Sequence, residues 1–175
     1  MDPNTTPIIT FVGKSGTGKT TFLEHLIPEL KRRGLRLAVL KHDAHQFEMD
    51  KPGKDTYRFT AAGADVVTIS NAGKFAMIER PRRELSVFDI VSRLPEVDLV
   101  LTEGYKHDHC PKIEIHRAAL ERPLIADPAE LLAVLTDEPL DIAAPQLPLS
   151  DISGCADFIE TYIRHFSAGG DAFHV

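Results

Sequence analysis

Eight consecutive residues near the start of the chain form a complete phosphate-binding loop of the G-x-x-x-x-G-K-[ST] type. The loop consists of Gly13, Lys14, Ser15, Gly16, Thr17, Gly18, Lys19 and Thr20. An apolar, strand-like run over 8–12 precedes it and a helical pattern follows it, which is the context that this motif requires. The first part of the chain is therefore expected to fold as strand, loop and helix.

The residue types of this loop suit the phosphates of a nucleotide. Its glycines allow the backbone N–H groups to turn toward phosphate oxygens, and the following helix adds the positive end of its dipole. Lys19 would reach the β- and γ-phosphates, and the Thr20 hydroxyl would bind Mg²⁺, which prefers a few protein oxygens together with phosphate oxygens and water. Thr21 completes the predicted set of phosphate-binding residues.

Length and composition predict one globular domain. Of the 175 residues, 43% are hydrophobic and 26% are charged, and no apolar run approaches the ~18 residues that span a bilayer. The net charge of −6 argues against a nucleic-acid-binding surface. Two distant cysteines and the lack of an apolar leader favour a reducing cytoplasm. We expect a flexible segment over 1–7, a nucleotide-binding domain over 8–166 and a flexible tail over 167–175.

Hydrophobic periodicity predicts alternating strands and helices. Helices are expected over 20–33, 55–62, 84–94 and 151–166, and strands over 8–12, 35–41, 66–70, 74–79, 98–104, 112–117 and 131–137. Strand, helix and buried strand in succession predict a parallel βαβ unit. The short Gly-bearing turn at 71–73 predicts an antiparallel hairpin, and the polar–apolar alternation over 112–117 predicts a half-exposed strand. The expected fold class is α/β, with a mostly parallel sheet and an antiparallel hairpin.

Carboxylates follow several of the predicted strands. Glu103 ends an apolar strand, where an acidic group can hold Mg²⁺ or its water, and Gly104 leaves room for the γ-phosphate. Asp43 follows another strand and is a further candidate for Mg²⁺ or for positioning water, although Asp50 and Asp55 compete for that role. The candidate catalytic residues are therefore Lys19, Glu103 and Asp43.

The sequence leaves the choice of nucleotide base open, because the usual guanine-reading sequence [NT]-K-x-D is absent. Asp137 ends a late strand, where its carboxylate could accept hydrogen bonds from N1–H and N2–H of guanine, which adenine cannot offer. The alternative is an ordinary strand-end turn before Pro139.

Lysines recur in segments predicted to lie at the carboxyl ends of strands, and in an acidic protein they indicate small polyanionic ligands. They are Lys14, Lys19, Lys41, Lys51, Lys54 and Lys106. Lys14 stands five residues before Lys19, the spacing of the extra lysine in the deviant P-loops of dimeric ATPases and GTPases, where it reaches the partner's site. A variable loop position is the alternative for Lys14.

The segment from His107 through Asp108 and His109 to Cys110 offers ligands that Zn²⁺ accepts, with His42 and His45 as further donors. No paired C-x-x-C or H-x-x-x-H spacing accompanies it. A solvated loop is the alternative interpretation.

Four segments together resemble the MobB family, the GTP-binding adaptor proteins of molybdopterin guanine dinucleotide biosynthesis. They are the phosphate loop with Thr21, the pair Lys41-His42, the D-K-P-G-K-D-T-Y stretch over 50–57 and the E-G-Y-K stretch over 103–106. The resemblance implies an α/β P-loop NTPase fold, GTP and Mg²⁺ as ligands, and at most a slow GTPase. It also implies a homodimer joined through antiparallel strands, and association with the guanylyltransferase that joins GMP to molybdopterin.

The resemblance gives the basic loops a further role. Lys51, Lys54 and Lys106 are expected to bind the phosphate of molybdopterin, as a second ligand, or the phosphates of the nucleotide. Two other functions remain open from the sequence. A small-molecule kinase would use the arginines at 80–83 as a lid, and a metallochaperone GTPase would use His107, His109 and Cys110 as metal ligands.

Overall fold

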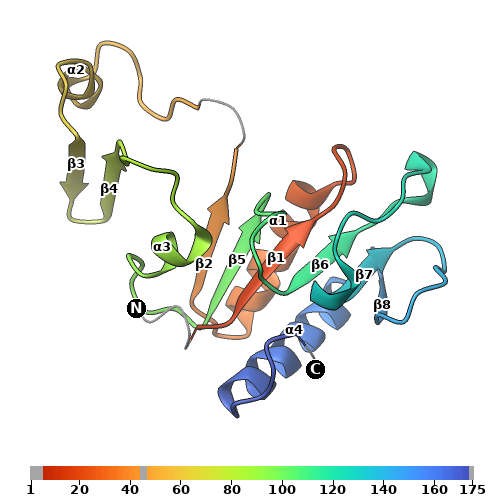
Figure 1. Ribbon diagram of the computed structural model, residues 1–175. Coiled ribbons are helices and arrows are strands. Elements are labelled where there is room, and N and C mark those ends of the chain that lie inside the picture. The colour runs from red at the N-terminus through yellow and green to blue at the C-terminus, as the bar shows by residue number, and fades with distance from the viewer. Residues whose placement is uncertain (1–5, 44–46, 174–175) are drawn as a thin grey trace. The chain divides into compact units, whose positions relative to one another are not determined.

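The computed structural model describes residues 6–43 and 47–173, which form two compact units (Figure 1). The first unit contains 6–42 and 87–173, and the second contains the described part of 43–86. The predicted domain over 8–166 covers most of both units, and its bounds stay a prediction. The predictions made for residues 1–5, for His45 and for 174–175 lie outside the described residues.

Six strands form the sheet of the first unit in the order β2-β5-β1-β6-β7-β8, and every neighbouring pair is parallel. The strands are β1 (Ile8–Val12), β2 (Leu37–Lys41), β5 (Leu99–Glu103), β6 (Lys112–Ile115), β7 (Leu131–Thr136) and β8 (Gln146–Pro148). Phe11 of β1 lies in register with Glu103 on one side and Ile113 on the other. Because all six strands run the same way, the loops that follow them meet at one edge, where parallel α/β sheets bind ligands.

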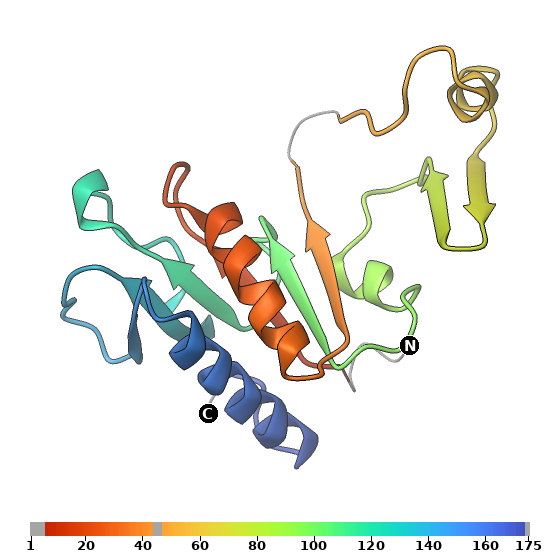
Figure 2. The ribbon, with the colours of Figure 1, turned by 180° about the vertical axis from the view of Figure 1, so that it is seen from behind.

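Two long helices cover one face of this sheet, α1 (Lys19–Arg32) and α4 (Ile152–Ser167), and they pack against each other (Figure 2). Leu26 of α1 and Ile159 of α4 are fully buried in the same core as Phe11. None of the helices in the described chain is long and apolar enough to cross a membrane.

Charged side chains join the C-terminal end of α1 to α4. Arg33 follows α1 and donates hydrogen bonds to Asp157 and Glu160 of α4 at 2.5 and 2.9 Å. Glu29 accepts hydrogen bonds from Arg32 and Arg33, which lower its pKa to about 2. The ion pairs therefore hold the C-terminal turn of α1 against α4.

A short helix, α3 (Val87–Val91), and the segment after β5 cover the opposite face, where Val87, Val100 and Cys110 share a second core. The predicted helix over 84–94 was too long. The helix begins at Val87, whose N–H donates to the Asp108 carboxylate, and just beyond its end the Ser92 hydroxyl donates to the Asp89 carbonyl.

The second unit contains α2 (Asp55–Ala61) and an antiparallel hairpin of β3 (Val66–Asn71) and β4 (Lys74–Glu79). The predicted hairpin is confirmed, and it forms a two-stranded sheet of its own, separate from the six parallel strands. Ile69 and Phe75 are more than half exposed, although both are large and apolar.

Strand β6 differs most from expectation, because all four of its residues are buried instead of half exposed. Lys112 forms an ion pair with Glu130 and donates to the Asp108 carbonyl. Glu114 accepts hydrogen bonds from the backbone N–H groups of Ile125 and Ala126 at 2.8 Å each. Both charges are therefore compensated inside the protein, which removes the need for solvent on that face.

Candidate nucleotide-binding site

The predicted phosphate loop connects β1 to α1 at the carboxyl edge of the sheet. Gly13 has a φ of 143° and Gly16 a φ of 86°, and residues with a β-carbon rarely adopt such values. Gly13 also lies against β6, where an added β-carbon would come within 2.6 Å of the Ile115 carbonyl oxygen. The glycine spacing that defines the motif therefore corresponds to a backbone that requires glycine.

Lys19 folds back over the loop that precedes it. Its ammonium group donates to the carbonyl oxygens of Gly13 at 2.9 Å and Lys14 at 3.2 Å. This position keeps the charge above the loop, where the N–H groups of a phosphate-binding loop gather around phosphate oxygens. Lys14 and Thr21 are exposed, and the Thr17 hydroxyl donates to the Lys14 carbonyl.

Thr20 and Glu103 come together although 83 residues separate them in the sequence. The Thr20 hydroxyl donates to the two carboxylate oxygens of Glu103 at 3.1 and 3.3 Å. Their contact follows from the pairing of β1 with β5, which places the end of β5 beside the start of α1. The strand-end carboxylate and the loop hydroxyl therefore form one cluster at the carboxyl edge.

The spacing of this pair fits Mg²⁺. Two oxygen ligands at right angles on an octahedral Mg²⁺ lie about 3.0 Å apart, because each metal–oxygen distance is about 2.1 Å. Among the described residues, no group of three or more His, Cys, Asp or Glu side chains could hold a metal ion. Thr20 and Glu103 therefore suit a cation that is also bound by phosphate and water, rather than one enclosed by protein ligands alone.

Gly104 allows a close approach beside this cluster, since an added β-carbon would lie 2.7 Å from the His42 carbonyl oxygen. Lys106 follows in the same segment and is exposed. Asp43, Lys51 and Lys54 belong to the second unit, so their part in the site stays a prediction. The same is true of the arginines at 80–83 that the kinase hypothesis would use.

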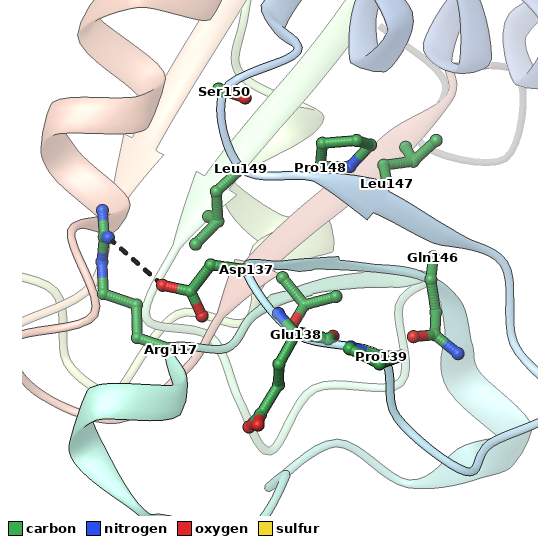
Figure 3. Close-up of a pocket in the computed structure, with 10 residues that line it drawn as sticks. Arg117, Asp137, Glu138, Pro139, Gln146, Leu147, Pro148, Leu149 and Ser150 are labelled. Carbon is green, nitrogen blue, oxygen red and sulfur yellow. Dashed lines mark hydrogen bonds and ion pairs between the residues drawn. The ribbon is translucent and has the colours of Figure 1, made fainter.

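An open pocket of about 730 Å³ lies at the ends of β7 and β8 (Figure 3). Asp137 and Glu138 line it after β7, Leu149 and Ser150 line it after β8, and Arg117 lines it after β6. A polar wall beside apolar side chains is the usual make-up of a small-molecule site. The pocket therefore places Asp137, the predicted base-reading residue, at a cavity on the same sheet edge as the phosphate loop.

Asp137 uses its two oxygens differently. Oδ1 accepts a hydrogen bond from the Ala118 N–H at 2.8 Å, whereas Oδ2 lies 3.8 Å from Nη1 of Arg117. Arg117 also donates from Nε to the Thr17 carbonyl in the phosphate loop at 2.7 Å. The sequence reasoning missed Arg117, and the available signal was a basic residue at the end of the strand predicted over 112–117.

The structure does not support a metal site over 107–110. Burial raises the pKa of the Cys110 thiol to about 12, with a further contribution from Asp108. His109 contacts the Glu130 carboxylate at 2.6 Å. Because the described chain holds no cluster of metal-binding side chains, the proposed ligands His107, His109 and Cys110 do not form one, and the solvated-loop alternative fits His107 and His109, which are exposed.

Comparisons with known proteins identify the family of this chain. The family model described as MobB, molybdopterin guanine dinucleotide synthesis protein B, matches residues 8–137. The molybdopterin-guanine dinucleotide biosynthesis adapter protein of Haemophilus influenzae is 39% identical over 165 residues, which cover 93% of each chain. The protein of that name from Escherichia coli K12 is also 39% identical over 165 residues, which cover 90% of this chain and 94% of its own.

Solved structures give the same result. The crystal structure of Bacillus subtilis MobB superposes with a TM-score of 0.71 and 29% identity, over 89% of this chain and 96% of that one. Another crystal structure of molybdopterin-guanine biosynthesis protein B superposes with a TM-score of 0.69 and 30% identity, over 88% of this chain and 98% of that one. The expected P-loop fold is confirmed, and this chain belongs to the MobB family.

Proposed function

We propose that this protein is a GTP-binding adaptor of molybdopterin-guanine dinucleotide biosynthesis, which assists the guanylyltransferase that attaches GMP to molybdopterin. The names of the relatives support the pathway. The observation that carries nucleotide binding is the contact between Thr20 and Glu103 beside an intact phosphate loop. We expect the protein to act in the cytoplasm.

The loop would hold the phosphates through its N–H groups and the start of α1, while Lys19 exchanges the Gly13 and Lys14 carbonyls for phosphate oxygens. Thr20 and Glu103 would hold Mg²⁺, which neutralises charge on the phosphates. Hydrolysis also needs a group that orients the attacking water, and Asp43 is the candidate. Because Glu103 is committed to Thr20 and the metal, we expect hydrolysis to be slow at most.

Asp137 would select guanine over adenine. Its carboxylate lines the pocket at the ends of β7 and β8 and can accept N1–H and N2–H of guanine. Replacement of Asp137 by Asn should weaken the binding of GTP and strengthen the binding of xanthosine triphosphate, because the amide can donate to the extra carbonyl oxygen of xanthine. Unchanged discrimination between the two nucleotides would reject this role.

The remaining parts of the proposal concern partners. Lys51, Lys54 and Lys106 would bind the phosphate of molybdopterin or of the nucleotide, and the exposed hairpin of β3 and β4 would join two copies into a homodimer. Lys14 would then act in the partner's site. Replacement of both Lys51 and Lys54 by Ala should weaken binding of molybdopterin or GTP, and unchanged affinity for both would contradict the assignment.

The decisive experiment is equilibrium binding of GTP and ATP in the presence of Mg²⁺, with Lys19→Ala as the control. We expect GTP to bind more tightly than ATP. Lys19→Ala loses a charged hydrogen bond to the nucleotide, so its affinity for GTP should be about tenfold to a hundredfold lower. Equal affinity of Lys19→Ala and the unaltered protein for GTP would refute nucleotide binding by the loop.

A further inference from the structure

Arg117 is the one side chain described above that touches both halves of the candidate nucleotide site. Its Nε donates to the Thr17 carbonyl at 2.7 Å, and its Nη1 lies 3.8 Å from Oδ2 of Asp137 (Figure 3). The guanidinium also packs over Gly18, where an added β-carbon would lie 3.3 Å from Nη2. One residue therefore spans the distance between the phosphate loop and the pocket.

The two charged groups present a donor beside an acceptor. At 3.8 Å the contact between Arg117 and Asp137 is an ion pair rather than a hydrogen bond, so each side can accept a new partner in the pocket. Both side chains are partly exposed, at 44% and 39%, and such an ion pair stabilises little by itself. A ligand can therefore replace it at small cost.

This pattern complements one face of a purine. Guanine carries an acceptor, O6, next to two donors, N1–H and N2–H, whereas adenine carries a donor, the 6-amino group, next to an acceptor, N1. If Asp137 accepts from N1–H and N2–H, the guanidinium beside it is the group of matching polarity for O6. Adenine would bring its amino group against the guanidinium and its N1 against the carboxylate.

We infer that Arg117 is a specificity-determining residue that reads O6 of guanine and, through Thr17, links recognition of the base to the position of the phosphate loop. The inference rests on the proposed binding of GTP and adds a second base-reading residue to Asp137. Arg117 is suited to this double contact because its planar fork can donate in two directions at once, which a lysine ammonium on a flexible stem does less well.

The test compares affinities for GTP, inosine triphosphate and ATP between the unaltered protein and Arg117→Ala. Inosine keeps O6 and N1–H but lacks the 2-amino group, so it isolates the contact to O6 from the second contact to Asp137. We expect Arg117→Ala to lower the affinities for GTP and inosine triphosphate by the same factor. The preference for GTP over ATP should fall about tenfold or more. Arg36→Ala, a change just before β2 at the opposite edge of the sheet, should leave the preference unchanged.

A second measurement begins with the unaltered protein, in which Arg117 keeps its contact with the phosphate loop. In 6-thioguanosine triphosphate a sulfur, which accepts hydrogen bonds weakly, replaces O6. The unaltered protein should bind this analogue less tightly than GTP, and Arg117→Ala should bind the two alike. Circular dichroism melting of the variant verifies that it is folded.

The outcomes separate the inference from the function on which it rests. If the unaltered protein prefers GTP and Arg117→Ala weakens GTP and ATP equally, Arg117 only supports the loop and the inference is wrong. If the unaltered protein fails to discriminate 6-thioguanosine triphosphate from GTP, no residue reads O6 and the inference is also wrong. If the unaltered protein binds ATP as tightly as GTP, both the proposed function and the inference fail.

Discussion

Replacement of Gly13 by Ala should damage the phosphate loop in a way that Gly16→Ala does not. Both glycines have positive φ values, 143° and 86°, so either substitution adds backbone strain of about 1–3 kcal/mol. Only at Gly13 does the added β-carbon meet other atoms, 2.6 Å from the Ile115 carbonyl oxygen, about 0.8 Å short of ordinary contact. At Gly16 nothing lies within 4 Å.

The difference in the free energy of unfolding between the two variants therefore reports the cost of the steric clash between the loop and β6. Overpacking of this kind costs roughly 1–3 kcal/mol, so the free energy of unfolding of Gly13→Ala should be lower than that of Gly16→Ala by about that amount. The Gly13 carbonyl also accepts the hydrogen bond from Lys19 at 2.9 Å. Displacement of Gly13 should therefore move Lys19 and weaken GTP binding further.

Urea denaturation without nucleotide gives the two free energies, and titration with GTP and Mg²⁺ gives the two affinities. Gly16→Ala serves as the matched control, because it has the same chemistry in the same loop. Equal losses of stability in the two variants would show that backbone conformation alone decides the cost, and the steric argument at β6 would then be wrong.

Three other changes test the surroundings of the site. Replacement of Lys112 by Met removes the buried cation beside Glu130 and leaves its carboxylate only the exposed His109 as a charged partner, so urea denaturation should show a loss of at most about 3–5 kcal/mol; a neutral result would mean that the ion pair is not needed. Glu29 has a pKa lowered to about 2 by hydrogen bonds from Arg32 and Arg33, so its contribution is present above its ordinary pKa of 4.5 and is lost as the pH falls toward 2. The stability difference between the unaltered protein and Glu29→Gln should accordingly shrink across that pH range, and a constant difference would contradict the assignment. Glu103→Gln should weaken GTP binding when Mg²⁺ is present and change it little when Mg²⁺ is chelated; equal losses in both conditions would exclude a role in holding the metal.

Most elements of the first unit could be predicted because the patterns that mark them lie within a few neighbouring residues of the sequence. Glycine spacing identified the loop, and apolar runs identified β1, β5 and β7. Strand β8 was missed because its three residues, Gln146–Pro148, end in proline and carry little periodicity. Strand β6 was misjudged because Lys112 and Glu114 find their partners 18 and 11 residues away, beyond any periodic pattern.

The candidate site shows the same limit. Glu103 could be proposed from the sequence because an acidic residue ended an apolar strand. The pairing of β1 with β5 then places it beside Thr20. Arg117 contacts Thr17, which is 100 residues distant in the sequence, and Asp137, which is 20 residues distant. Its role depends on the order of β1, β6 and β7 in the sheet, which periodicity does not specify.

The hairpin of β3 and β4 has a consequence for how the protein opens in solution. A two-stranded hairpin is marginally stable by itself in water, and here large side chains such as Ile69 and Phe75 stay more than half exposed. The amide hydrogens of this hairpin should therefore exchange with solvent far faster than those of β1 and β5, through local opening that leaves the parallel sheet intact. A partner that covers the hairpin would be detected as slower exchange at these amides, at a position in the sequence separate from the nucleotide loop.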